Sequence, residues 1–307
     1  MQTDSISVVI PVYNSQQTLK PLVLKLKEVL EKTAREFEII MVNDASEDNS
    51  WSVIKDISRS HQFVRGLNMM RNYGQHNALL AGIRQAKYEY IVTIDDDLQH
   101  PPEEIAKLSK KIKEGYDVVY GSPQKEQHGF FRNFASQFIK LALKTVMKVE
   151  IAQEVSALRI FKTDLRKAFE NYSGSYPNID VFLMWGTKKI AAVKVKHEER
   201  KDGTSNYTFS KLFIHAINLT TGFSVLPLRI ASFLGFMFTI FGFIVLLYVV
   251  GRFLLQGSPV AGFPFLASII ALFSGAQLFS LGIIGEYLAR MHYRLMERPT
   301  YTIKDSI

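Results

Sequence analysis

The most constraining stretch of this sequence is an apolar run that ends in three consecutive carboxylates. Residues 91–94, Ile-Val-Thr-Ile, favour a strand, and Asp95, Asp96 and Asp97 follow directly. Pro102 with two glutamates behind it is typical of the first turn of a helix. The pattern predicts a buried strand that ends at an acidic turn. Three adjacent carboxylates repel one another unless a cation lies among them.

Carboxylate and amide oxygens are the ligands that hard divalent cations prefer. We therefore predict that Asp95, Asp97 and Gln99 hold Mg²⁺ or Mn²⁺, which could bridge them to a substrate diphosphate. Asp95 and Asp97 are also the predicted catalytic residues. The alternative is a solvated acidic turn. The position at a strand end favours the metal site, because open sheets bind ligands at the carboxyl ends of their strands.

Strand patterns and helix patterns alternate through the first 120 residues. Strands are expected at 5–10, 37–42, 64–69, 91–94 and 117–120, with helices at 17–32, 48–60, 78–85 and 102–114 between them. This alternation predicts an α/β fold with a mostly parallel sheet and helices on both faces. The side chains expected to converge at one edge of that sheet are Tyr13, Asp44, Tyr73 and Asp95 to Asp97.

Several classes of protein are disfavoured by what the sequence lacks. No G-x-G-x-x-G motif follows the first strand and no G-x-x-x-x-G-K-[ST] motif occurs, which argues against dinucleotide enzymes and P-loop NTPases. The chain has no cysteine, so it has neither disulfides nor thiolate metal sites. A site with Asp44 for a ribose or base and the acidic triad for a metal fits a nucleotide sugar instead.

The formal net charge of +8 and the pI of about 9.4 indicate an anionic partner. No platform of basic and aromatic residues is present, so we predict no nucleic-acid partner and attribute the charge to a membrane surface.

Two uncharged apolar runs follow, at 230–250 and 260–284, and each is long enough to cross a bilayer. Basic residues flank the pair on both outer sides, whereas the connecting loop carries only Arg252. The positive-inside rule therefore predicts two spans with both ends in the cytoplasm. The polar residues Met1 to Asp4 lead directly into a strand, so no secretory signal is expected.

These patterns predict four regions. They are a cytosolic catalytic domain at 1–209, an interfacial amphipathic segment at 210–228, a two-helix transmembrane domain at 229–289 and a cytosolic tail at 290–307.

Three segments resemble the signature blocks of family 2 glycosyltransferases: Val8–Asn14 (VVIPVYN), Val42–Ser50 (VNDASEDNS) and Asp95–Glu103 (DDDLQHPPE). More narrowly, the chain resembles the polyprenyl-phosphate glycosyltransferase group. Residues 71–76 and 115–119 look closest to its branch that transfers formylated aminoarabinose to undecaprenyl phosphate. The likeness runs in order through nearly the whole chain.

The resemblance implies a GT-A-type fold and inverting transfer of a sugar from a nucleoside-diphosphate sugar, a UDP-sugar, to polyprenyl (undecaprenyl) phosphate. The reaction would occur at the cytoplasmic face of the inner membrane and serve the cell envelope. Relatives also imply a homo-oligomer, namely a tetramer. The implied nucleotide-sugar contacts are Pro11, Tyr13, Asn14, Asp44, Ser46, Tyr73, Gln75, Asp95 and Asp96.

The resemblance assigns the acceptor phosphate to Arg132, Ser136, Arg200 and Ser205. Residues 130–148 have an amphipathic helical pattern, and the i, i+4 spacing puts Arg132 and Ser136 on one face. A phosphate acceptor is already anionic at neutral pH, so the reaction does not need a general base, and none is assigned.

Two alternative functions follow from other features. A processive polysaccharide synthase would share the fold but carries a Q-x-x-R-W block, whereas Trp185 lies in the sequence Leu-Met-Trp-Gly. A non-catalytic membrane scaffold is the second alternative, and the intact acidic triad with Gln99 argues against it.

Overall fold

The computed structural model describes residues 5–123, 154–174, 176–198, 221–256 and 262–307. The chain forms two compact units, one of residues 1–216 together with 297–307, and one of residues 217–296. The first unit is therefore discontinuous in sequence, because the chain returns to it after the second unit.

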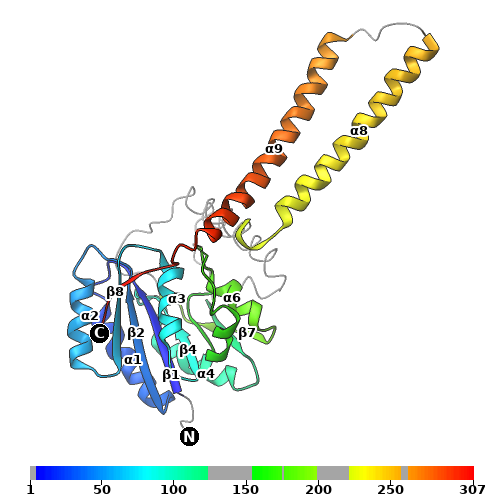
Figure 1. Cartoon of the computed structure of the whole chain (residues 1–307). Coiled ribbons are helices and arrows are strands. Elements are labelled where there is room, and N and C mark those ends of the chain that lie inside the picture. The colour runs from blue at the N-terminus through cyan, green and yellow to red at the C-terminus, as the bar shows by residue number, and fades with distance from the viewer. Residues whose placement is uncertain (1–4, 124–153, 175, 199–220, 257–261) are drawn as a thin grey trace. The chain divides into compact units, whose positions relative to one another are not determined.

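Eight strands of the described residues form one mixed sheet in the first unit (Figure 1). They are β1 Ser5–Val12, β2 Glu36–Asn43, β3 Val64–Met69, β4 Tyr90–Thr93, β5 Val118–Pro123, β6 Arg159–Lys162, β7 Ile190–Val195 and β8 Ile303–Ser306. Their order is β7-β5-β6-β4-β1-β2-β3-β8. Strands β6 and β8 run antiparallel to their neighbours, and the remaining pairs are parallel.

Helices cover both faces of this sheet. They are α1 Leu19–Thr33, α2 Ser50–Ser60, α3 Gln75–Gln85, α4 Ile105–Ile112 and α6 Ile179–Gly186, with short 3₁₀ segments η1 Pro102–Glu104 and η3 Thr163–Ala168. The main hydrophobic core joins α1, α2 and α4 to one face, whereas α3 packs against β1 and β2 from the other. Alternate residues of β1 serve the two faces, as the pleat of a strand requires. Val8 belongs to the main core, and Val9 lies under α3.

The predicted fold class is confirmed, because the structure has a mostly parallel sheet between layers of helices. The first five predicted strands match β1 to β5 within a few residues. Strands β6, β7 and β8 were not predicted. In particular, residues 303–306 were assigned to a tail, and they form an edge strand beside β3.

The second unit contains two long helices, α8 Leu226–Gln256 and α9 Phe263–Leu295. By length and composition, Leu226–Arg252 and Leu272–Leu295 could each cross a membrane. Large apolar side chains such as Phe233, Leu254 and Leu278 are exposed on them. Two long apolar helices therefore follow the α/β portion of the chain, as predicted. The boundaries at 209, 228 and 289 stay predictions, and residues 210–220 lie outside the described part.

Helix α3 approaches the sheet closely at Gly82. A Cβ at this position would overlap Val9 Cγ1 and lie 3.1 Å from Val42 Cγ2. Replacing a helical glycine by alanine normally stabilises a helix by about 1 kcal/mol. Here we expect the opposite sign, because overpacking a well-filled core costs about 1–3 kcal/mol.

The Gly82→Ala variant should therefore unfold at a lower temperature than the parent chain, measured by thermal unfolding of the full chain in detergent. Gln85→Ala, an exposed change near the end of the same helix, is the control. A Gly82→Ala variant as stable as this control would contradict the close packing.

Candidate active site

Four adjacent parallel strands end at one edge of the sheet, and the loops after them carry the predicted donor and metal residues. In sheet order these strands are β4, β1, β2 and β3. Hydrogen bonds join the loop after β1 to the loops after β2 and β4. Others join the segment after β3 to the same two loops. The structure thus brings these residues together, whereas their roles toward a donor or metal stay predictions.

Neighbouring loops hold the first two carboxylates of the acidic triad. Asp95 Oδ1 accepts a hydrogen bond from Gln75 Nε2 at 2.7 Å. Asp96 Oδ2 accepts one from the backbone amide of Tyr13 at 3.2 Å. The triad is therefore fixed by both the β1 loop and the first residue of α3.

The third carboxylate closes its own turn. Asp97 Oδ1 accepts a hydrogen bond from the backbone amide of Gln99 at 3.1 Å, and Leu98 between them has a φ of 61°. This left-handed residue reverses the chain over a short distance, which keeps Asp97 and Gln99 at the same strand end. The backbone carbonyl of Gln99 also accepts a hydrogen bond from Glu198 at 2.8 Å.

Burial and repulsion from neighbouring carboxylates raise the pKa values of Asp95 and Asp96. Burial raises the pKa of Asp95 to about 7, and the negative charges of Asp97 and Asp96 add to the shift. Burial likewise raises the pKa of Asp96 to about 6, although hydrogen bonds from Ser15 and the Tyr13 amide oppose it. Carboxylates in this state gain from any cation that comes close.

A buried arginine acts on Asp95 of the triad, and the sequence did not point to it. Arg159 is 2% exposed, and its Nε donates to Thr93 Oγ1 at 2.8 Å. Its Nη1 forms an ion pair with Asp180, which also accepts from the Tyr120 hydroxyl at 3.1 Å. The guanidinium attracts the Asp95 charge and partly offsets its raised pKa. The signal in the sequence was an arginine directly before the apolar residues Ile160 and Phe161. A charge within a buried strand indicates a buried ion pair, because a buried charge needs a partner.

Asp44 organises the loop after β3. Its carboxylate is 3% exposed and accepts hydrogen bonds from the backbone amides of Tyr73 at 2.7 Å and Gly74 at 2.8 Å. Burial raises its pKa, and these two hydrogen bonds lower it. Arg71 lies over the Tyr73 ring at 4.7 Å, within the same loop. Asp44 was predicted to contact a ribose or base. The structure adds that its carboxylate holds the loop after β3 through the Tyr73 and Gly74 amides.

Hydrogen bonds join the loop after β1 to the loop after β2. The Asn14 amide donates to Ser46 Oγ at 3.0 Å, and Asn14 Oδ1 accepts from the Glu47 amide at 2.8 Å. Asn14 has a φ of 54°, a conformation that asparagine tolerates better than most residues. Pro11 is buried within β1, whereas the Tyr13 side chain is 42% exposed. The Tyr13 side chain is therefore available to a ligand.

The donor set at the strand end fits a hard divalent cation. Within the described ranges, no three His, Cys, Asp or Glu side chains group closely enough to form a complete site. Asp95, Asp97 and Gln99 nevertheless offer oxygen ligands at a place where two carboxyl pKa values are raised. Mg²⁺ is commonly bound by one or two carboxylates together with substrate phosphates and water. The residues present match that mode better than an all-protein cage.

The predicted acceptor residues Arg132, Ser136, Arg200 and Ser205 lie outside the described residues, as does the predicted amphipathic helix at 130–148.

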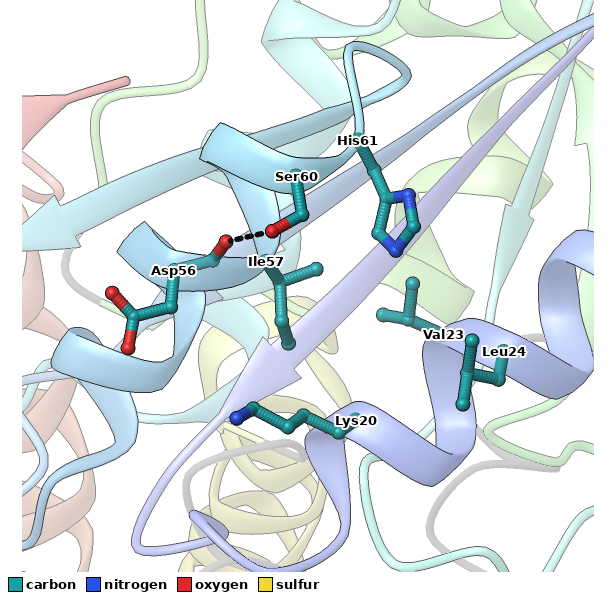
Figure 2. A pocket seen from close by; sticks show the side chains of 7 residues that line it. All are labelled: Lys20, Val23, Leu24, Asp56, Ile57, Ser60 and His61. Atoms are coloured by element: carbon teal, nitrogen blue, oxygen red, sulfur yellow. Dashed lines mark hydrogen bonds between the residues drawn. The ribbon is translucent and has the colours of Figure 1, made fainter.

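A shallow groove between α1 and α2 is lined by none of the predicted site residues (Figure 2). Its lining residues are Lys20, Val23, Leu24, Asp56, Ile57, Ser60 and His61.

The fold is shared with two solved synthases of sugar phosphoglycerates. Glucosyl-3-phosphoglycerate synthase from Mycobacterium tuberculosis, in complex with Mn²⁺, UDP and glucosyl-3-phosphoglycerate, superposes with a TM-score of 0.53. The match has 16% identity and covers 71% of this chain and 78% of the other. Mannosyl-3-phosphoglycerate synthase from Rubrobacter xylanophilus gives a TM-score of 0.52 at 15% identity, covering 70% and 72%.

Sequence relatives match over nearly the full length. The undecaprenyl-phosphate 4-deoxy-4-formamido-L-arabinose transferase of Pectobacterium atrosepticum is 32% identical over 99% of this chain and 94% of its own. The enzyme of the same name from Shewanella sediminis is 33% identical over 98% and 92%. Residues 7–175 match the profile described as glycosyl transferase family 2. That region is more than half of the chain and contains the acidic triad and the loops after β1, β2, β3 and β4, and the chain therefore belongs to glycosyl transferase family 2.

Proposed function

We propose that this enzyme transfers a sugar from a UDP-sugar to undecaprenyl phosphate at the cytoplasmic face of the membrane, with inversion at the anomeric carbon. The observation that carries the proposal is the acidic triad at the end of β4, where burial and repulsion create a demand for positive charge. Similarity to undecaprenyl-phosphate transferases over 99% of the chain supports the acceptor, because it includes the two apolar helices.

The reaction needs no external base. An oxygen of the acceptor phosphate forms a bond to the anomeric carbon of the sugar, and the bond from that carbon to the donor diphosphate breaks. The products are the polyprenyl phosphosugar and UDP, which leaves with the bonding electrons and the added negative charge. No proton moves, since the phosphate monoester is already anionic near neutral pH. The main electrostatic demand is therefore charge that develops on the leaving diphosphate.

On the donor side, Tyr13, Tyr73 and the Asp44-shaped loop would hold the nucleotide. Pro11, Asn14 and Ser46 would shape the same edge, and Gln75 and Asp96 would orient the acidic turn. Asp95, Asp97 and Gln99 would hold Mg²⁺ or Mn²⁺, which when bound stabilises the negative charge of the diphosphate.

On the acceptor side, the lipid phosphate would be bound by Arg132, Ser136, Arg200 and Ser205. Each charge-assisted hydrogen bond from an arginine would replace water lost near a bilayer. A homotetramer is likewise retained as a prediction.

The connectivity of the first unit supports a hairpin in the membrane. The chain leaves this unit before α8 and rejoins it after α9, because residues 297–307 belong to it and β8 pairs with β3. A chain that must return to the domain it left crosses a membrane an even number of times. The basic residues outside the two helices support a cytoplasmic position for that domain.

The direct test supplies membranes containing the protein with undecaprenyl phosphate and a panel of nucleotide sugars that includes UDP-4-deoxy-4-formamido-L-arabinose. Formation of a lipid-linked sugar from one member would support the proposal, and the absence of product from every member would reject it.

Asp97→Asn should reduce transfer to below about 1% of the parent rate, because losing a preorganised electrostatic group costs about 10²–10³-fold. EDTA should have a comparable effect that excess Mg²⁺ or Mn²⁺ reverses. Asp56→Asn, an exposed change on α2, is the matched control. Transfer that persists at the parent rate in Asp97→Asn, or in EDTA, would exclude the metal site.

Asp95→Asn should stabilise the protein in the absence of metal. Folding raises the pKa of Asp95 from 3.8 to about 7, so its charge opposes folding increasingly as the pH rises through that interval. An asparagine keeps the acceptor for Gln75 and removes the charge. We expect a gain on the order of 1 kcal/mol, or about 2–4 °C in Tm, at pH 8 and little at pH 4. Thermal unfolding in EDTA measures the difference. A gain that shrinks as the pH rises would contradict the assignment.

Single cysteines should report the orientation cleanly, because the chain has none of its own. A cysteine replacing Ser258 between the two apolar runs should react with an impermeant maleimide on intact cells. Cysteines replacing Ser60 or Lys304 should react only after permeabilisation. The reverse labelling pattern would refute the orientation.

A further inference from the structure

A continuous chain of side-chain hydrogen bonds runs from the C-terminal strand to the donor loops. Asp305 Oδ2 accepts from Asn68 Nδ2 at 3.2 Å, and Asn68 Oδ1 accepts from Asn43 Nδ2 at 2.7 Å. Asn43 Oδ1 accepts from Ser46 Oγ at 2.6 Å. Ser46 Oγ in turn accepts from the Asn14 amide at 3.0 Å. The chain thus crosses from β8 through β3 and β2 to the loop after β1.

The strand register makes these links direct. Asn68 pairs with Asn43 across β3 and β2, and with Asp305 across β3 and β8. Asn43 is 2% exposed and Asn68 is 7% exposed, so both amides are withdrawn from water. Asparagine is disfavoured in strands, and a buried amide costs free energy unless it is hydrogen-bonded. Two apolar side chains would pack here without that cost, which indicates that the amides serve something other than stability.

A backbone hydrogen bond also joins the segment just before β8 to the end of β3. The Met70 amide donates to the carbonyl of Thr302 at 3.0 Å, just beyond the end of β3. The next residues form the loop whose Tyr73 and Gly74 amides bind Asp44. The C-terminal segment therefore contacts β3 immediately before the loop, as well as through the amide chain.

We propose that Asn43 and Asn68 are positioning residues that make the placement of the donor loops depend on strand β8. Because β8 follows α9 in the chain, the segment that leaves the apolar helices also sets the loops after β1 and β2. The proposal rests on the proposed function only in taking these loops to bind the nucleotide. The hydrogen-bond chain itself is a property of the free protein.

Hydrogen exchange of the full chain in detergent, without donor, tests the positioning directly. In Asn68→Ala, amides at 13–17 and 43–50 should exchange about three- to tenfold faster, as expected for the loss of one or two hydrogen bonds. In Asp305→Ala, the same amides should exchange about twofold faster or more. Asp305 is exposed, so its removal leaves the core intact. Asp305→Asn keeps an acceptor for Asn68 and should restore parent exchange.

Lys304→Ala, an exposed change on the same strand, is the matched control and should leave both segments unchanged. Unchanged exchange at 13–17 and 43–50 in both Asn68→Ala and Asp305→Ala would overturn the proposal. Equal acceleration in Lys304→Ala would also overturn it, since that result would indicate general loosening of β8.

Steady-state kinetics then separate positioning from general damage. With the UDP-sugar that supports transfer, Asn68→Ala should raise the donor KM about three- to tenfold, with kcat and the acceptor KM within about twofold of the parent. A fall in kcat with the donor KM unchanged would contradict the positioning role. If the parent enzyme transfers no sugar from any UDP-sugar, the proposed function fails, and the exchange experiment still decides the role of Asn43 and Asn68.

Discussion

The negative charge of the carboxylates at the partly buried end of β4 is the constraint on which the rest of this sheet edge depends. The carboxyl groups of Asp95 and Asp96 have raised pKa values because water is partly excluded and because each repels its neighbours. Gln75 and the Tyr13 amide offer dipoles, not charge. Among the described residues, Arg159 attracts the charge of Asp95, and it is shared with Asp180. The negative charge of the triad is what the proposed divalent cation would complement.

The antiparallel strand β6 explains how that arginine reaches the triad. A strand that runs against its neighbour begins where the neighbour ends, so Arg159, the first residue of β6, pairs with Thr93, the last residue of β4. A parallel strand would place its own first residue at the opposite edge of the sheet. The single reversed strand beside β4 thus provides a buried cation at the carboxyl end, and the ion pair with Asp180 keeps it there.

Elements that depend on local or periodic patterns could be predicted from the sequence, whereas contacts between distant residues could not. The first five strands and the acidic turn could be predicted because alternating apolar and amphipathic segments have a characteristic period. Strand β8 could not, since Ile303–Ser306 is a short, mostly polar edge strand with no apolar alternation. The contact of Asp44 with the Tyr73 and Gly74 amides was also beyond reach, because it depends on how two loops fold against each other. Family resemblance identified Asp44 and Tyr73 without showing that one holds the other.

Because β8 completes the sheet from the far end of the chain, the order of synthesis constrains how the enzyme folds. Asn68 and its partner Asp305 are 237 residues apart in sequence, so their contact forms only after both apolar helices have been made. Contacts between such distant residues form late, since the entropy of closing the intervening loop must be overcome first. Until then, β3 is an unpaired edge that can recruit other strands. Synthesis of both apolar helices therefore precedes completion of the sheet, and the first unit gains its last strand only at the end of translation.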